Sequence, residues 1–197
     1  MINIRKHKLV EWMVILGVIS ILYFSGWHKE VIGKLQQGVL ATGLIKPEVN
    51  ERKKSEMEFF SGDMILESAS GERTTLSQMQ GKVLFINFWA TWCPPCIAEM
   101  PGINELYKQT DTDEVAFLMI SRDEDFSKAI AFAQRKGFDF PIYRLKSPLP
   151  SVLQSRVLPT TYIIKKDGEI VVEHQGMADY NNEKMKELLN QLSNEQI

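Results

Sequence analysis

The chain has 197 residues, of which 44% are hydrophobic and 24% are charged, and its formal net charge is -2. This composition is that of a globular protein, and the length suits one folded domain with an additional terminal segment. A nearly neutral chain lacks the concentrated Lys and Arg surface that phosphate backbones require, so we expect no binding to nucleic acid. Only two cysteines occur, which excludes a scaffold built on several disulfides.

The N-terminal segment is strongly apolar. After a basic run at residues 5–8, residues 9–27 carry one charged side chain, Glu11. In a helix, about 19 residues reach about 28 Å, close to the hydrocarbon thickness of a bilayer at about 30 Å. Because basic residues are in excess before this segment, the N-terminus is predicted to be cytoplasmic. We therefore expect residues 1–28 to form a cytoplasmic stub and a single transmembrane anchor in the cell membrane, with the remaining chain periplasmic or otherwise extracytoplasmic.

Two other interpretations of this segment remain open. A cleavable signal peptide needs small residues just past the apolar run, and residues 23–27 offer no clean pair. A buried core helix is the second alternative, although a basic, aromatic-flanked segment is unusual there. Residues 29–58 become highly charged and are predicted to form a linker, which can include an amphipathic helix on the membrane surface around residues 31–45. We place the folded domain at residues 59–197.

Local patterns along the domain predict a mixed α/β structure. Apolar runs bounded by turn residues indicate strands, and apolar positions at helical spacing indicate helices. A strand–helix–strand–helix order is typical of a parallel sheet, and a late pair of strands around residues 166–168 has the pattern of an antiparallel hairpin. We expect a mixed sheet with helices on both faces. The predicted strands are 64–67, 73–76, 83–90, 115–121, 160–165 and 169–174, and the predicted helices are 94–109, kinked at Pro101, 125–136, closed by Gly137, and 181–192.

The two cysteines stand in Cys93-Pro94-Pro95-Cys96, between a predicted buried strand and a predicted helix. At this spacing the two sulfurs can close a small disulfide ring. The helix N-terminus stabilises a thiolate through its free N–H groups and partial positive charge, so we expect Cys93 to be the attacking nucleophile. Cys96, one turn into the helix, is expected to be buried and to resolve the mixed disulfide. Neither proline has an N–H, which leaves the Cys96 amide as the nearest donor to the Cys93 sulfur.

A cysteine pair can also serve as a zinc site, a structural disulfide or two inert core thiols. Zinc normally takes four ligands, which two cysteines and three scattered histidines hardly provide. A c-type haem site needs His after the second cysteine, where Ile97 stands. A peroxiredoxin-type site would carry Thr or Ser in place of Ala90 and Pro in place of Ile86. We therefore expect a redox-active disulfide with no further cofactor and no metal.

Residues 87–96, Asn-Phe-Trp-Ala-Thr-Trp-Cys-Pro-Pro-Cys, resemble the thioredoxin superfamily. Pro101 and the sequence Leu158-Pro159-Thr160-Thr161-Tyr162 before a predicted strand add to this resemblance. Within the superfamily, the chain is similar to the membrane-tethered extracytoplasmic reductases of the TlpA and ResA type over about residues 59–192. The resemblance implies a thioredoxin-like α/β fold, in which helices flank a mixed central sheet, and the local pattern of residues 64–76 adds an N-terminal hairpin extension to it.

The resemblance also implies roles for particular residues. Pro159 is expected to form a cis peptide bond facing the disulfide, with an ordinary trans loop proline as the alternative. Thioredoxins place a buried Asp six residues before the first cysteine, where this chain has Asn87, which cannot titrate. The tethered reductases instead have Glu six residues after that cysteine, and Glu99 matches. We expect Glu99 to accept the Cys96 proton, with a solvated surface carboxylate as the alternative. The residues expected in the substrate groove or packed beside the site are Trp92, Pro94, Pro95, Leu158 and Thr160.

The expected function is the reduction of disulfides in exported proteins by dithiol exchange, with cytochrome c maturation as the first candidate pathway. Electrons would come from a membrane protein that relays them from the cytoplasm to this anchored monomer. A disulfide oxidase or isomerase of the same fold is the nearest alternative, because direction depends on the reduction potential. A tethered, non-enzymatic binding module and a metal-delivery protein also remain open.

Overall fold

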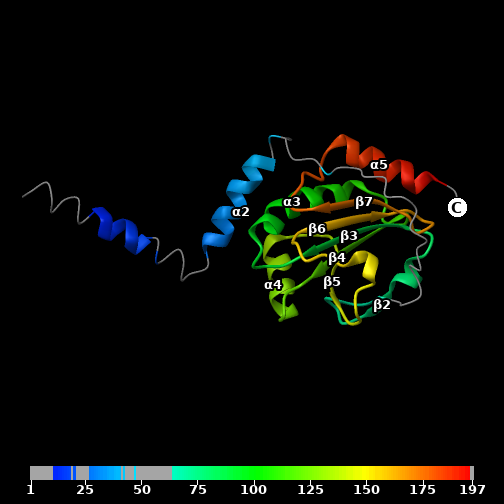
Figure 1. Cartoon of the computed structure of the whole chain (residues 1–197), viewed down its shortest axis with the longest axis horizontal. Helices are drawn as coiled ribbons and strands as arrows, with labels where there is room; N and C mark the ends of the chain where they lie inside the picture. The colour runs from blue at the N-terminus through cyan, green and yellow to red at the C-terminus, as the bar shows by residue number, and fades with distance from the viewer. Residues whose placement is uncertain are drawn as a thin grey trace, which may run out of the picture.

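The central strand β3 (Val83–Trp89) is buried along its whole length, as its continuous apolar run predicts. In the computed structural model it pairs in parallel with β4 (Val115–Ser121) and antiparallel with β6 (Thr160–Ile164). Beyond them, β5 (Ile142–Leu145) runs parallel to β4, and β7 (Ile170–Gln175) runs antiparallel to β6. The predicted mixed sheet and its late antiparallel hairpin are therefore confirmed (Figure 1).

The predicted N-terminal hairpin is also present, as β1 (Ile65–Ser68) and β2 (Arg73–Thr75). It is part of the main sheet, because β1 pairs antiparallel with β5. Within the described residues the sheet has seven strands in the order β2-β1-β5-β4-β3-β6-β7. Strand β5 was not predicted, because the order of apolar and polar side chains in its four residues has no period that distinguishes a strand from a loop.

Three long helices follow the predicted boundaries within one or two residues. They are α3 (Pro94–Gln109), α4 (Phe126–Lys136) and α5 (Glu183–Asn194). Helix α4 begins after Asp125, whose carboxylate accepts a hydrogen bond from the Ser127 amide, and it ends at Gly137, whose φ of 68° is in the left-handed region that favours glycine. Pro101 lies inside α3, which continues as one helix on both sides of it.

The three long helices lie on one face of the sheet and not on both faces as predicted, and within the described residues only short 3-10 helices lie on the other face. Buried residues of α3, α4 and α5 join one hydrophobic cluster with Val83, Phe85 and Trp89 of β3. The alternate residues of β3 belong to a second cluster, which the short 3-10 helices η1 (Leu76–Met79) and η2 (Ser151–Leu153) help to cover. Strands β3, β4 and β5 are parallel and lie next to one another in chain order. Helix α3 connects β3 to β4, and helix α4 connects β4 to β5. Because both connections are right-handed and run in the same direction across the sheet, both helices lie on the same face.

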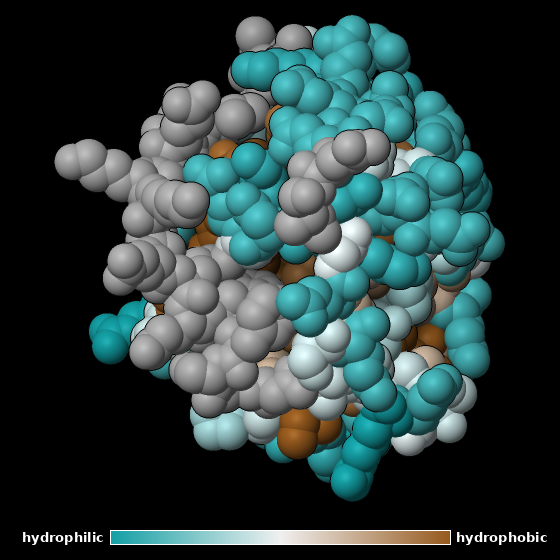
Figure 2. Space-filling view, turned by 90° about the vertical axis from the view of Figure 1, so that its right-hand side faces the viewer, coloured by the Kyte–Doolittle hydropathy of each residue, from teal (hydrophilic) through white to brown (hydrophobic). Residues whose placement is uncertain are grey.

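The structure describes residues 11–18, 20, 27–40, 42, 47 and 64–195. Of the predicted apolar segment at residues 9–27, residues 11–18 and 20 are helical, and the other positions before Trp27 lie outside the described residues. Among the residues that are described, no helix combines the length and the apolar character needed to cross a membrane. The face on the right-hand side of Figure 1 carries mainly hydrophilic residues where the structure describes it (Figure 2).

A helix is present in the predicted linker, as α2 (Trp27–Leu40). It lies beside α3 (Figure 1), a contact that was not predicted. Gly33 packs so closely that an added Cβ would lie 3.2 Å from Cγ2 of Ile97, and the Gln37 side-chain amide donates to the Ile97 carbonyl at 3.5 Å. One face of α2 is therefore used to pack on the domain, while the side chains of Val31, Ile32, Leu35 and Val39 are exposed.

Candidate redox site

The two cysteines form a disulfide at the N-terminus of α3, with an S–S distance of 2.05 Å. Cys93 is the N-cap residue, and Pro94 and Pro95 occupy the first positions of the helix. The Cys96 amide donates to the Cys93 sulfur at 3.3 Å, as predicted from the missing N–H groups of the prolines. Cys96 is 0% exposed and Cys93 is 4% exposed, so an incoming sulfur reaches the bond from the Cys93 side.

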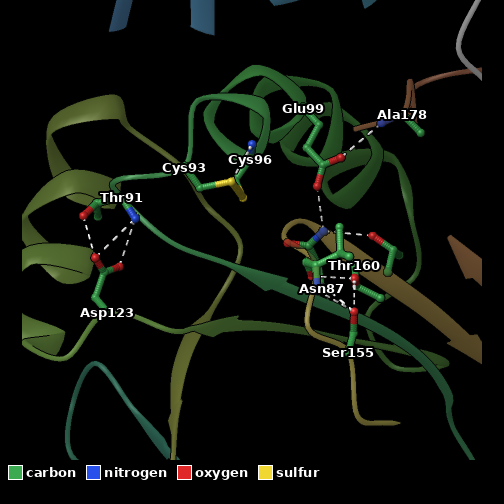
Figure 3. The surroundings of a disulfide bond; sticks show 11 residues. Asn87, Thr91, Cys93, Cys96, Glu99, Asp123, Ser155, Thr160 and Ala178 are labelled. Carbon is green, nitrogen blue, oxygen red and sulfur yellow. Dashed lines mark hydrogen bonds between the residues drawn. A yellow bond between two sulfur atoms is a disulfide. The ribbon is translucent and has the colours of Figure 1, made fainter. Parts of the chain in front are cut away.

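The loop before Cys93 is held by Asp123, at the end of the neighbouring strand β4. Its carboxylate accepts hydrogen bonds from the Thr91 amide at 3.0 Å and the Thr91 hydroxyl at 2.6 Å (Figure 3). The Ser121 hydroxyl donates to the same carboxylate at 2.9 Å. This contact was not predicted. It could have been found, because β3 and β4 are parallel and residues that follow adjacent parallel strands meet at one sheet edge.

We expect Asp123→Ala to lower the free energy of unfolding by about 1–3 kcal/mol, because it leaves part-buried donors of Thr91 and Ser121 without their acceptor. Urea unfolding of the oxidised protein measures the change. Asp123→Asn retains one side-chain oxygen that can accept from the Thr91 amide, so its loss should be smaller. Asp113→Ala, at an exposed position, is the control, and an equal effect of the two alanine variants would contradict this role.

Glu99 lies in α3, three residues after Cys96, and is 1% exposed, so the alternative of a solvated surface carboxylate is wrong. One carboxylate oxygen accepts from the Asn87 side-chain amide at 2.7 Å, and the other accepts from the Ala178 amide at 3.2 Å (Figure 3). Burial raises the pKa of Glu99 to about 8, and the two hydrogen bonds partly oppose this shift. Glu99 is therefore mostly protonated at neutral pH.

A pKa of about 8 for Glu99 lies close to that of an ordinary thiol, at about 8.5. Proton transfer between groups of similar pKa has a small free-energy cost, which is the condition for efficient acid–base catalysis. Glu99 also lines a hollow of about 340 Å³, together with Gln37 and Leu40 of α2 and Asp179 beyond β7. The arrangement can pass a proton between the helix that carries Cys96 and the side of the molecule covered by α2.

The peptide bond between Leu158 and Pro159 is cis, as the resemblance implies. The Pro159 carbonyl accepts from the Gly176 amide at 2.8 Å, which ties this loop to the end of β7. Two side-chain hydroxyls form hydrogen bonds inside this loop. The hydroxyls of Ser155 and Thr160 are hydrogen bonded to each other at 2.8 Å (Figure 3). The Thr160 hydroxyl also donates to the Val157 carbonyl. Thr160 is fully buried, so its role is packing and not contact with a substrate.

A groove of about 680 Å³ opens beside the disulfide. Of the five residues expected in the groove or packed beside the site, all but Thr160 line it, and the Trp92 side chain is 52% exposed there. Three further lining residues were not predicted, because exposed polar residues in two separate loops give no periodic signal. The residues that line the groove are Trp92, Cys93, Pro94, Pro95, Arg122, Ser155, Arg156 and Leu158.

A disulfide whose first cysteine caps a helix, a cis proline and this sheet order define a thioredoxin-like protein. Residues 61–173 match the model of the AhpC/TSA family. The chain is 36% identical over 129 residues to the thiol–disulfide oxidoreductase ResA of Halalkalibacterium halodurans, covering 64% of this chain and 73% of that protein. It is 30% identical to the thioredoxin-like protein YneN of Bacillus subtilis, covering 85% of this chain and 91% of YneN.

The crystal structure of StoA from Bacillus subtilis has the same fold, with a TM-score of 0.54 and 23% identity over 64% of this chain and 94% of that one. The chain belongs to the AhpC/TSA family and, within it, is similar to the ResA proteins. It is a thiol–disulfide oxidoreductase, and its Cys93 and Cys96 are joined in a disulfide.

Proposed function

We propose that this protein is a membrane-anchored reductase that transfers electrons to disulfides of exported proteins. The observation that carries the proposal is the division of the site into two sides. Cys93 lines an open groove, whereas Cys96 and Glu99 are buried behind it. A substrate disulfide can reach the nucleophile, while the resolving thiol and its proton acceptor are kept from solvent.

In the reducing direction, the Cys93 thiolate attacks one sulfur of the substrate disulfide and displaces the other as a thiolate. The Cys96 thiol then gives its proton to Glu99 in the ionised form, which is the minor form at neutral pH, and attacks the Cys93 sulfur, which releases the second substrate thiolate. Two electrons pass from the cysteine pair to the substrate. One substrate thiolate takes up the proton that Cys96 passed to Glu99, and the other takes up from solvent the proton that Cys93 lost when it ionised. The products are the Cys93–Cys96 disulfide and a substrate dithiol.

An extracytoplasmic location is supported by the N-terminal segment. Residues 9–27 are nearly free of charge, and the large apolar side chains of residues 12–16 and 18 are exposed. Exposed apolar residues in such a run suit a lipid environment. In this location the electron donor is a membrane protein that relays electrons from the cytoplasm, and apocytochromes c awaiting haem attachment are the first candidate substrates.

The midpoint potential of the couple, measured on the full chain in detergent against a glutathione redox buffer, tests the direction of electron flow. We expect a value near that of thioredoxin, about -270 mV, and a value near about -120 mV would indicate an oxidase instead. Cys96→Ser should trap substrates in cells as mixed disulfides with Cys93. Recovery of cytoplasmic proteins alone in these adducts would contradict the proposed location.

A further inference from the structure

Two arginines face the groove beside the disulfide, and neither has a partner among the residues that the structure describes. Arg122 and Arg156 are two of the eight lining residues, and no Asp or Glu is among the eight. No ion pair or hydrogen bond of either guanidinium group is found within the described part of the chain. Arginine stays protonated at all physiological pH values, so two positively charged side chains line the groove.

Both arginines are placed by a fixed backbone. Arg122 directly follows β4, and its amide donates to the Trp89 carbonyl at 2.8 Å. Arg156 lies in the loop that leads to the cis proline, next to Ser155, whose hydroxyl accepts from the Val157 amide at 3.1 Å. The two side chains therefore reach the groove from two different segments, each tied to the framework that positions the cysteine pair.

Acidic residues near Arg122 in the sequence do not line this groove. The Asp123 carboxylate is used by Thr91 and Ser121, and the Asp125 carboxylate caps α4 through Ser127. Glu124 is exposed and is absent from the groove lining. The two arginines are therefore the charged side chains that line the groove.

The geometry points to a charge preference in the substrate: the groove selects exported polypeptides that carry acidic side chains next to the reacting cysteine. The inference rests on the proposed reductase function and names the substrate class for that site. The exposed Trp92 ring and Leu158 provide apolar contact for the substrate chain. The planar guanidinium groups match the geometry of carboxylates, which they bind with two parallel hydrogen bonds.

Three synthetic peptides test this preference. They share one sequence with an internal disulfide, and the residues flanking the cysteines are Glu, Gln or Lys. The full-chain protein, reduced and held in detergent, is mixed with each peptide, and the second-order rate constant is measured from single-turnover peptide reduction. Attraction between the exposed arginines and Glu should raise the rate about threefold over the Gln peptide, and repulsion of Lys should lower it about threefold. The Glu peptide should therefore react about tenfold faster than the Lys peptide. The ratio should fall towards one in 0.5 M salt, because exposed charges are screened.

Charge reversal identifies the residues responsible. We expect Arg122→Glu and Arg156→Glu each to reduce the preference, and the double variant to make the Lys peptide the faster one. Lys184→Glu, the same charge change at an exposed position on α5, is the matched control and should leave the ratio unchanged.

The possible failures are distinguishable from one another. Equal rates for the three peptides with the unmodified protein would overturn the charge preference while leaving the reductase function intact. An equal change of all three rates in the arginine variants would also overturn the charge preference. That result would mean that the arginines act on the reactivity of the cysteine pair and not on the charge of the substrate. Reduction of none of the peptides would overturn the proposed function on which the inference rests.

Discussion

Cys93→Ser should reduce disulfide exchange by at least about a thousandfold, because a serine hydroxyl is not ionised at neutral pH and cannot form a disulfide. Cys93 is the member of the pair that lines the groove, so its loss removes the first step of the reaction. The measurement is the rate at which the full-chain protein, reduced beforehand, reduces a peptide disulfide.

Cys96→Ser is the matched control for this variant. It retains the nucleophile, so it should form the mixed disulfide with the substrate and then stop, and the adduct should be visible by mass spectrometry. A tethered binding module would behave differently: Cys93→Ser would retain its partner with unchanged affinity, and neither variant would lose its activity.

Glu99→Gln should change how stability depends on pH. Burial raises the pKa of Glu99 from 4.5 to about 8 in the folded protein, so between these values the folded state holds a proton that the unfolded state has released. The stability of the unmodified protein therefore falls as pH rises through this window and levels off above pH 8. Each pH unit inside the window corresponds to about 1.4 kcal/mol. Glutamine does not titrate, so the variant should lose this dependence of stability on pH. Relative to the unmodified protein, its free energy of unfolding should therefore increase as the pH rises. Urea unfolding at pH 5 to 9 measures the difference.

The same variant should slow the second step of exchange by about a hundredfold, the usual scale for loss of a positioned acid or base. The rate at which the mixed disulfide resolves measures this step. Glu105→Gln, an exposed position on the same helix, serves as the control for both measurements. Parallel stability curves for Glu99→Gln and the unmodified protein would refute the raised pKa, and an unchanged resolution rate would refute the role in proton transfer.

Most of the framework could be predicted from local patterns. The buried strand β3, helix α3 and the hairpin of β6 and β7 follow from apolar runs, a helix-starting proline and turn residues. The Cys93–Cys96 spacing at a strand–helix junction indicated the chemistry, and the motif around Pro159 implied the cis bond. These features depend on residues close together in the sequence, so one sequence determines them. Strand β5 and the placement of the helices on a single face did not follow, because they depend on which strands become neighbours.

The cysteine pair and the mixed α/β class followed from the amino-acid sequence, because both rest on short-range spacing. The assembled fold alone shows that Glu99 is buried against Asn87 and Ala178, which raises the pKa of this carboxyl group. It also shows that Asp123 holds Thr91 and that Arg122 and Arg156 line one groove. The physical reason is the same in each case. Burial and charge proximity depend on distances between segments far apart in the sequence, and those distances exist only once the sheet has assembled.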